Sequence, residues 1–240
     1  DFRVRSPGRP VRVEDLVLHV SGLEDYTDGD DWGLSDREFA ELTTEGHLQL
    51  INQTDALTAP GRQYIYNNSG YVLLALVVER TSGQSFAEFA TRRLFQPAGM
   101  RATRITDRLG KRFAHQARGY KTSDDGGVRL SESPSSVTGD GNVYSSSTDM
   151  IAWMRALDGN RVLSAAQKRR AFAPGKLDSG AYIDSEGSGY GYGWSIDGDG
   201  RVSHSGSWMG TATYVARDHA AGVSALLPIL ALGVPGSATA

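Results

Sequence analysis

Two short stretches of the sequence carry side chains that could take part in proton transfer. Tyr66 and Asn68 are separated by one residue, and His204, Ser205 and Gly206 follow one another later in the chain. A phenol can carry a proton, but its ordinary pKa of about 10 means that it acts as a base only beside positive charge. An imidazole is largely neutral near pH 7, and a glycine lets a ligand approach the backbone closely. The two stretches are therefore candidates for one catalytic site.

Each of these side chains also has a purely structural interpretation. Tyr66 could be a half-buried tyrosine bonded to backbone, Asn68 the N-cap of a following helix, and His204 a histidine at the edge of a strand. Either triplet could occur by chance, so only their joint occurrence favours a site. His19 is predicted to be structural, because it could satisfy polar groups at a helix end. Three aromatic residues could equally line a cleft or fill the core of a sheet: Tyr190, Trp194 and Trp208.

The elements that must position these side chains are mainly helices in the first three quarters of the chain. Acidic residues after Val13 predict a short helix that stops at Gly22. Apolar residues at helical spacing after Pro60-Gly61 predict a mostly buried helix that ends before Gly83. Capping-box spacing predicts three more helix starts, at Ser35, Ser85 and Ser146. The helix from Ser85 should run to about Leu94, and Pro97 should close it. The helix from Ser146 should run to Leu157, with an apolar face formed by Met150, Ile151, Met154 and Leu157.

The last part of the chain has the alternation and turn residues of an antiparallel sheet. From Gly189 onward, aromatic residues alternate with glycines, and turn residues over 197–200 precede Val202, which predicts a β-hairpin. Two further strands are predicted, at Thr211–Ala216 and Gly222–Leu227. Together with the helices, these strands predict an α+β fold.

The domain organisation follows from this change of pattern. We predict a helical region over residues 14–174, an antiparallel sheet region over residues 175–240, and a lead-in over residues 1–13. The stretch from Ser123 to Gly141 is rich in glycine, serine and aspartate, and it is interpreted as a loop rather than a domain linker.

The composition argues against several classes of protein. A net charge of -3 gives no electrostatic reason to expect nucleic acid as a partner. The apolar run from Val223 to Val234 contains Pro228 and Gly233 and is shorter than the roughly 20 residues of a transmembrane helix. The chain has no cysteine, and its 5 histidines show no metal-ligand spacing. No transmembrane segment, metal or cofactor is therefore expected.

Several segments, taken in order, carry a family resemblance that covers nearly the whole chain. They are residues 16–23, 60–71, 139–146, 190–194 and 202–206. In this order the chain resembles the serine β-lactamase and penicillin-binding-protein family, in particular class C β-lactamases and the related esterases and D-aminopeptidases. The resemblance implies a β-lactamase/transpeptidase-like fold, an antiparallel sheet flanked by helices plus a mostly helical region.

The resemblance also implies a chemistry and a set of site residues. Family members attack an ester, amide or β-lactam carbonyl with a serine from a Ser-x-x-Lys helix and form an acyl-enzyme. A small molecule or a peptide would be the substrate. A histidine in place of a lysine favours an esterase or D-peptidase over a true β-lactamase. The resemblance implies that Tyr66 is the general base and that Asn68 orients the substrate. It implies that His204 and Gly206 belong to a strand element that corresponds to Lys-Thr-Gly in relatives. The amide of Ser207 would then form half of an oxyanion hole, and Trp208 would line the cleft.

One departure from the family pattern affects the catalytic machinery itself. None of the 240 residues forms a Ser-x-x-Lys motif. In relatives that helix and the first sheet strands lie upstream of the matching segments, so we expect them before Asp1. This chain would then be a fragment, and a missing N-terminal segment or a second chain would complete the sheet. The alternative is a catalytically silent ligand-binding or sensor domain. A periplasmic or secreted location is suggested by the resemblance alone.

Overall fold

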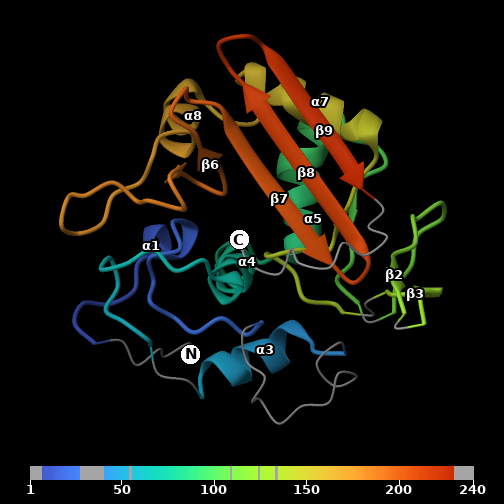
Figure 1. Ribbon diagram of the computed structural model, residues 1–240, viewed down its shortest axis with the longest axis horizontal. Coiled ribbons are helices and arrows are strands. Elements are labelled where there is room, and N and C mark those ends of the chain that lie inside the picture. Colours follow the sequence, from blue (N-terminus) through green and yellow to red (C-terminus); the bar gives the residue numbers. More distant parts are fainter. Residues whose placement is uncertain are drawn as a thin grey trace.

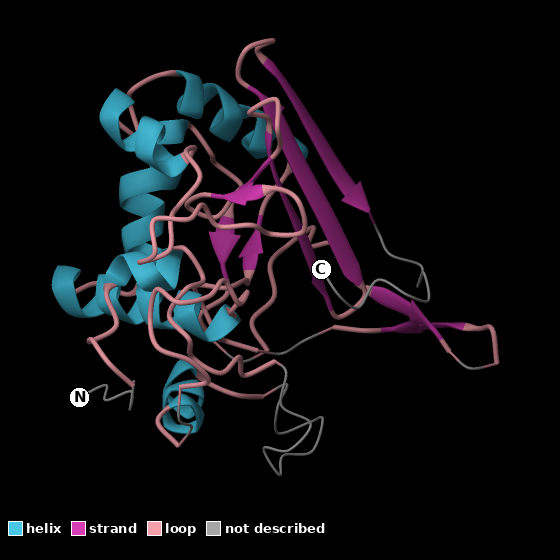
Figure 2. Cartoon of the chain, turned by 60° about the vertical axis from the view of Figure 1, so that its left-hand side comes forward, coloured by secondary structure: helices cyan, strands magenta, loops and turns pink. Residues whose placement is uncertain are grey.

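A helical part and a five-stranded antiparallel sheet make up the fold (Figure 1). The computed structural model describes residues 7–27, 41–53, 56–108, 110–123, 125–132 and 135–229. The helices gather on one side of the long strands (Figure 2). This arrangement confirms the predicted α+β class.

The first helices pack around α4, which carries the first candidate site stretch at its N-terminus. They are α1 (Val13–Val17), α3 (Thr44–Ile51) and α4 (Asn68–Ser82). The predicted end of α4 is confirmed, since Gly83 caps it with a φ of 69°. Buried residues of all three helices form one apolar cluster with Leu23, which follows α1: Leu16, Leu48, Ile51 and Leu73.

The end of α1 differs from the prediction. The helix stops at Val17 rather than near Gly22, because His19 takes a left-handed backbone conformation with a φ of 56°. The amide of Val20 then bonds the carbonyl of Asp15 at 2.9 Å, which turns the chain out of the helix. The helix start predicted at Ser35 lies outside the described residues.

The helix predicted from Ser85 is present but continues further than expected. Its capping box is confirmed, with Ser85 and Glu88 bonding each other's backbone amides. The helix runs through α5 (Phe86–Ala90), a π-helical segment η1 (Thr91–Phe95) and α6 (Gln96–Ala98). Pro97 lies within the last turn rather than after it, and the helix ends one residue later at Ala98, where Gly99 with a φ of 80° forms the C-cap.

Two helices follow in the second half of the helical region, α7 (Ser147–Asp158) and α8 (Ala165–Ala171). The predicted start of α7 is confirmed, since the hydroxyl of Ser146 accepts from the amide of Asp149. Its predicted apolar face needs one correction. Ile151 is 51% exposed, because at about 100° per residue it lies about 120° around the helix from the buried Leu157.

Two small antiparallel pairs also lie in this region. They join β1 (Arg104–Ile105) to β4 (Val143–Tyr144), and β2 (Tyr120–Thr122) to β3 (Val128–Leu130). The loop prediction for Ser123–Gly141 is therefore wrong where β3 lies. The β2–β3 hairpin is exposed, and the amide of Ser123 closes it by donating to the carbonyl of Gly127 at 2.8 Å.

The main sheet has its strands in chain order. They are β5 (Gly189–Tyr190), β6 (Ser195–Ile196), β7 (Val202–Trp208), β8 (Thr211–Asp218) and β9 (Val223–Ile229). The predicted hairpin is β6–β7, and it and both predicted terminal strands are confirmed. His204 pairs with Val215, and Gly206 pairs with Thr213, so the second candidate stretch lies on a central strand.

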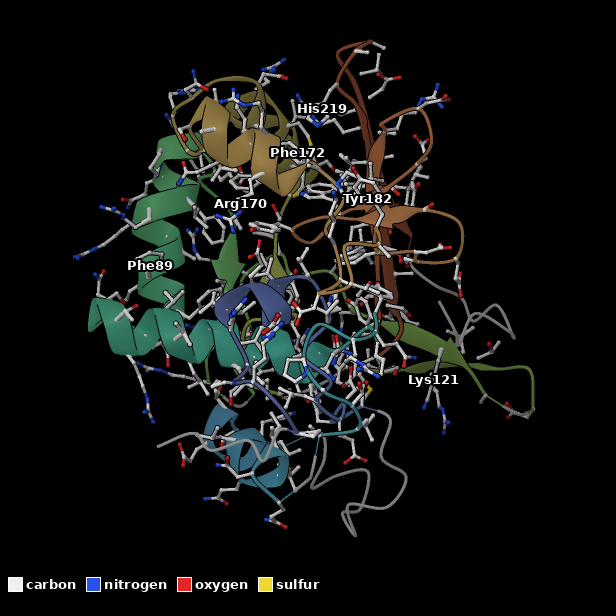
Figure 3. All side chains as sticks on the ribbon, turned by 90° about the vertical axis from the view of Figure 1, so that its left-hand side faces the viewer. Phe89, Lys121, Arg170, Phe172, Tyr182 and His219 are labelled. Carbon is white, nitrogen blue, oxygen red and sulfur yellow. The ribbon has the colours of Figure 1, made fainter. Side chains whose placement is uncertain are left out.

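The helical part and the sheet are joined by buried contacts. Leu18 and Val20 share an apolar cluster with Ile183 and Tyr190. At the other end of the sheet, Phe172 after α8 lies against His219 in the β8–β9 turn, with ring centroids 4.5 Å apart (Figure 3). The boundary between residues 174 and 175 stays a prediction, since both sides contribute to one core.

Candidate active site

Tyr66 and Asn68 are placed by the N-terminus of α4. The N-cap is Asn67, whose side-chain oxygen accepts from the amide of Gly70 at 2.7 Å. Its side-chain nitrogen donates to the carbonyl of Leu23 at 2.8 Å, and the residue is only 1% exposed. Because Asn67 is anchored on both sides, the residues before and after it project from a fixed point.

Asn68 is the first residue of α4 and is held by a buried carboxylate. Asp25, 3% exposed, accepts from the backbone amide of Asn68 at 2.5 Å and from its Nδ2 at 2.9 Å. The same Nδ2 donates to Thr27 Oγ1 at 3.2 Å. Both hydrogens of the side-chain amide are then used, so Oδ1 is the atom that remains to face a ligand.

Tyr66 lies beside Asn67 with its ring partly open to solvent, at 38% exposure. The ring of His19 lies under it, with centroids 4.2 Å apart. Burial, with smaller contributions from Tyr64, Asp25 and Asp140, raises the pKa of Tyr66 to about 12. The phenol is therefore protonated at neutral pH, in surroundings whose charges are negative.

His204 is brought to this site by β7. Its ring centroid lies 6.3 Å from that of Tyr66. Its Nδ1 lies 2.6 Å from the carbonyl oxygen of Ser205, and its Nε2 lies 3.4 Å from Tyr190 Oη. Burial lowers the pKa of His204, so the imidazole is neutral at pH 7. The structure thus joins the two candidate stretches, which lie far apart in the sequence.

The three other predicted site residues follow His204 along β7 and are exposed. A side chain at Gly206 would lie 2.9 Å from Thr213 Oγ1, so the paired strand leaves room for glycine there. Trp208, 38% exposed, ends the strand at a tight turn, where Thr211 donates to its carbonyl. Among the described contacts, Gly206, Ser207 and Trp208 are joined to β8, and none joins them to Tyr66 or Asn68.

Sequence reasoning missed several residues that build the site. Asp25 carries no motif that would single it out, and Asn67 was overlooked beside Asn68, although its spacing to Gly70 fits an N-cap. Tyr190, left open between cleft and core, is 2% exposed and lies in the core. The structural role predicted for His19 agrees with its burial beneath Tyr66.

Two further features of the described residues bear on ligands and membranes. No group of three or more histidine, aspartate or glutamate side chains in these residues has an arrangement that could hold a metal ion. No helix in the same part of the chain combines the length and apolarity needed to cross a membrane.

Comparison with known proteins places this geometry in a family. The family model described as Beta-lactamase matches residues 3–228. The chain belongs to the beta-lactamase family. Among curated relatives of this beta-lactamase-family chain, penicillin-binding protein 4* of Bacillus subtilis (strain 168) is 33% identical over 237 residues, covering 89% of this chain and 51% of the relative. A D-aminopeptidase of Brucella anthropi is 29% identical over 189 residues, covering 77% of this chain and 34% of the relative.

Solved structures of the family have the same fold. A penicillin-binding protein from Bacillus halodurans matches with a TM-score of 0.77 at 25% identity, covering 90% of this chain and 68% of that structure. An octameric penicillin-binding protein homologue from Pyrococcus abyssi matches with a TM-score of 0.77 at 25% identity, covering 93% of this chain and 52% of that structure. The predicted β-lactamase/transpeptidase-like fold is confirmed. The chain spans about half the length, or less, of the curated relatives it matches.

Proposed function

We propose that this chain provides the base and the substrate-orienting side of a serine hydrolase site that works through an acyl-enzyme. The supporting observation is the convergence of Tyr66 and His204, whose ring centroids are 6.3 Å apart, beside Asn68 at the start of α4. In acyl transfer the phenol can carry a proton and the amide can hold the substrate beside the nucleophile, while the imidazole adjoins the phenol.

In this mechanism Tyr66 takes the proton of the attacking hydroxyl and returns it to the leaving group. Its pKa of about 12 leaves it protonated, so a positive charge must lower that pKa before it can act as a base. Asp25 and Asp140 would attract such a cation electrostatically. The nucleophilic serine and its lysine would lie outside these 240 residues, which contain no Ser-x-x-Lys motif. The amide of Ser207 would stabilise the oxyanion.

The favoured substrates are esters and D-amino peptides or amides rather than β-lactams. The described charges that act on Tyr66 are carboxylates, which disfavour a substrate carboxylate of the kind that β-lactams carry. Asn68 presents Oδ1, which can accept from an N–H group of a substrate. The relatives named D-aminopeptidase, 29% identical in one case, agree with this choice.

The test is covalent labelling of the full-length protein by a serine-directed fluorophosphonate. Tyr66→Phe should slow labelling about 100-fold or more, because it removes the group that carries the proton. Tyr182→Phe is the matched control, since Tyr182 is 63% exposed and contacts Lys176 rather than the site. Equal labelling rates for the two variants would contradict the role of Tyr66.

The second candidate function is a catalytically silent ligand-binding or sensor domain. The missing Ser-x-x-Lys motif and the protonated phenol of Tyr66 favour it. It predicts that the full-length protein binds a D-amino-acid amide or ester measurably by calorimetry but is never labelled. Labelling of the wild-type protein rejects this function.

A further inference from the structure

We propose that Tyr190, supported by His19, is a positioning residue that fixes the ring of His204 through a directed chain of hydrogen bonds. The proposal rests on the proposed function to the extent that His204 belongs to the site. The chain runs from the start of α4 through His19 and Tyr190 to β7, and each of its steps has a defined direction. Those directions follow from which atoms can only donate and which can only accept.

The first part of the chain fixes the proton of His19. The backbone amide of Asn67 donates to His19 Nδ1 at 2.9 Å, so that nitrogen carries no hydrogen. His19 is 2% exposed, and burial lowers its pKa to about 3, so the ring is neutral. A neutral ring without a hydrogen on Nδ1 has one on Nε2. That hydrogen is donated to Tyr190 Oη, 3.1 Å away.

The far end of the chain fixes the proton of His204 in the opposite way. Its Nδ1 lies 2.6 Å from the carbonyl oxygen of Ser205, which can only accept, so Nδ1 carries the hydrogen. In the neutral ring Nε2 is then an acceptor. Tyr190 Oη lies 3.4 Å from it and still has its own proton, for which the hydroxyl oxygen of the neighbouring Tyr71 is a second acceptor. The proposal assigns that proton to the bond with His204, so that Tyr190 accepts from one histidine and donates to the other.

The chain lies in a rigid aromatic cluster that also supports Tyr66. Tyr190 is 2% exposed, and the rings of His19 and Tyr64 lie 5.0 and 5.4 Å from it. The ring of His19 in turn lies 4.2 Å from that of Tyr66. One buried support thus holds both the phenol and the imidazole of the site.

This arrangement determines what His204 can offer to a substrate. While His204 is neutral, its single N–H is used by Ser205 and its free nitrogen faces Tyr190. It then offers no hydrogen to a substrate. His204 serves instead to hold β7 against the aromatic cluster, and substrate donors must come from other groups.

The first experiment measures the two tautomers by NMR of the full-length protein labelled at histidine nitrogens. His204 is assigned by the resonance lost in His204→Gln, and His19 by the one lost in His19→Gln. We expect the hydrogen on Nε2 of His19 and on Nδ1 of His204. A hydrogen on Nε2 of neutral His204 overturns the proposal, whatever the activity of the protein.

The second experiment compares Tyr190→Phe with Tyr64→Phe, which makes the same change in the same cluster outside the chain of bonds. Tyr190→Phe removes the bonds to both histidines, and it should shift the Nε2 resonance of His204 and slow fluorophosphonate labelling about tenfold, as expected when the bond that orients His204 is lost. Tyr64→Phe should change neither. Unchanged His204 resonances in Tyr190→Phe, or equal slowing in both variants, would refute the positioning role. Absence of labelling in the wild-type protein would instead refute the proposed function, and the resonances would still decide this inference.

Discussion

At the scale of single residues, the site is organised by buried acids rather than by bases. Asp25 accepts from Asn68, and Asp140 accepts from the hydroxyl of Tyr26. Both carboxyl groups contribute to the raised pKa of Tyr66. A phenol in this position becomes a useful base only when a cation offsets those charges. A cation beside Tyr66 is therefore a requirement of the proposed function.

Asp25 is the residue on which the geometry of Asn68 depends most directly. Its Oδ2 accepts from the backbone and the side chain of Asn68, and its Oδ1 accepts from the backbone and the hydroxyl of Thr27. Asp25→Asn replaces one acceptor oxygen by an NH₂ group and leaves buried donors unpaired. We expect the free energy of unfolding to fall by about 1–3 kcal/mol, as measured by urea denaturation of the full-length protein.

The control for this substitution is Glu24→Gln, a similar loss of charge at the neighbouring, half-buried residue. It should change the free energy of unfolding by less than about 0.5 kcal/mol. Asp25→Asn should also raise the KM for an ester substrate, because the amide of Asn68 is then free to rotate. A stability and a KM equal to those of Glu24→Gln would show that Asp25 does not hold the site.

At the scale of elements, local signals predicted the helices and strands whose ends are set by their own sequence. Ser146 caps α7, Gly83 ends α4, and β8 pairs with β7 and β9 over the predicted residues. The failures occur where tertiary contacts decide the backbone. His19 takes a left-handed backbone conformation because its ring is hydrogen-bonded to Asn67 and Tyr190. The hydrophobic periodicity of the sequence does not predict these contacts.

The contact between α7 and the sheet depends on a buried arginine. Arg217 on β8 is 3% exposed, bonds the carbonyl oxygen of Met154 at 2.9 Å, and forms an ion pair with Asp158. Arg217→Lys keeps the charge but loses the planar fork that reaches these partners together. We expect it to lower the free energy of unfolding by about 1–3 kcal/mol in chemical denaturation.

Arg201→Lys provides the matched comparison for that change. Arg201 forms ion pairs with Asp199 and Asp218, but its side chain is 54% exposed. Exposed pairs contribute little, so its replacement should cost less than about 0.5 kcal/mol. If both lysine variants unfold at the same denaturant concentration, burial of Arg217 is not what joins α7 to the sheet.

At the scale of the whole molecule, the site forms only when distant parts of the chain meet. The sequence predicted that Tyr66, Asn68 and His204 belong together, because each occurs in a motif with a recognisable local setting. It could not predict Asp25 or the role of Tyr190, since their importance arises from contacts across the fold.

The sheet face that carries Tyr214 and Leu227, 38% and 53% exposed, is uncovered in the described residues. A missing segment or second chain on that face stays a prediction.

The buried histidines make the stability of the whole fold depend on pH. Burial lowers the pKa of His19 to about 3 and also lowers the pKa of His47 and His204. In the unfolded chain each histidine titrates near about 6.5, so below that pH the unfolded state binds more protons than the folded state. Stability therefore falls as the pH drops from about 6.5, by up to about 1.4 kcal/mol per pH unit for each histidine that stays neutral. Asp140 opposes this loss, because burial raises its pKa.

His47 isolates one part of this effect, because it is buried and its Nε2 has no hydrogen-bond partner. Urea denaturation of the full-length protein between about pH 7.5 and about pH 5 covers the histidines and stays above most carboxyl groups. His47→Asn should make the loss of stability with falling pH less steep than in the wild-type protein. His115→Asn, at an exposed histidine, should leave that slope unchanged. Equal slopes for His47→Asn and the wild-type protein would contradict the lowered pKa of His47.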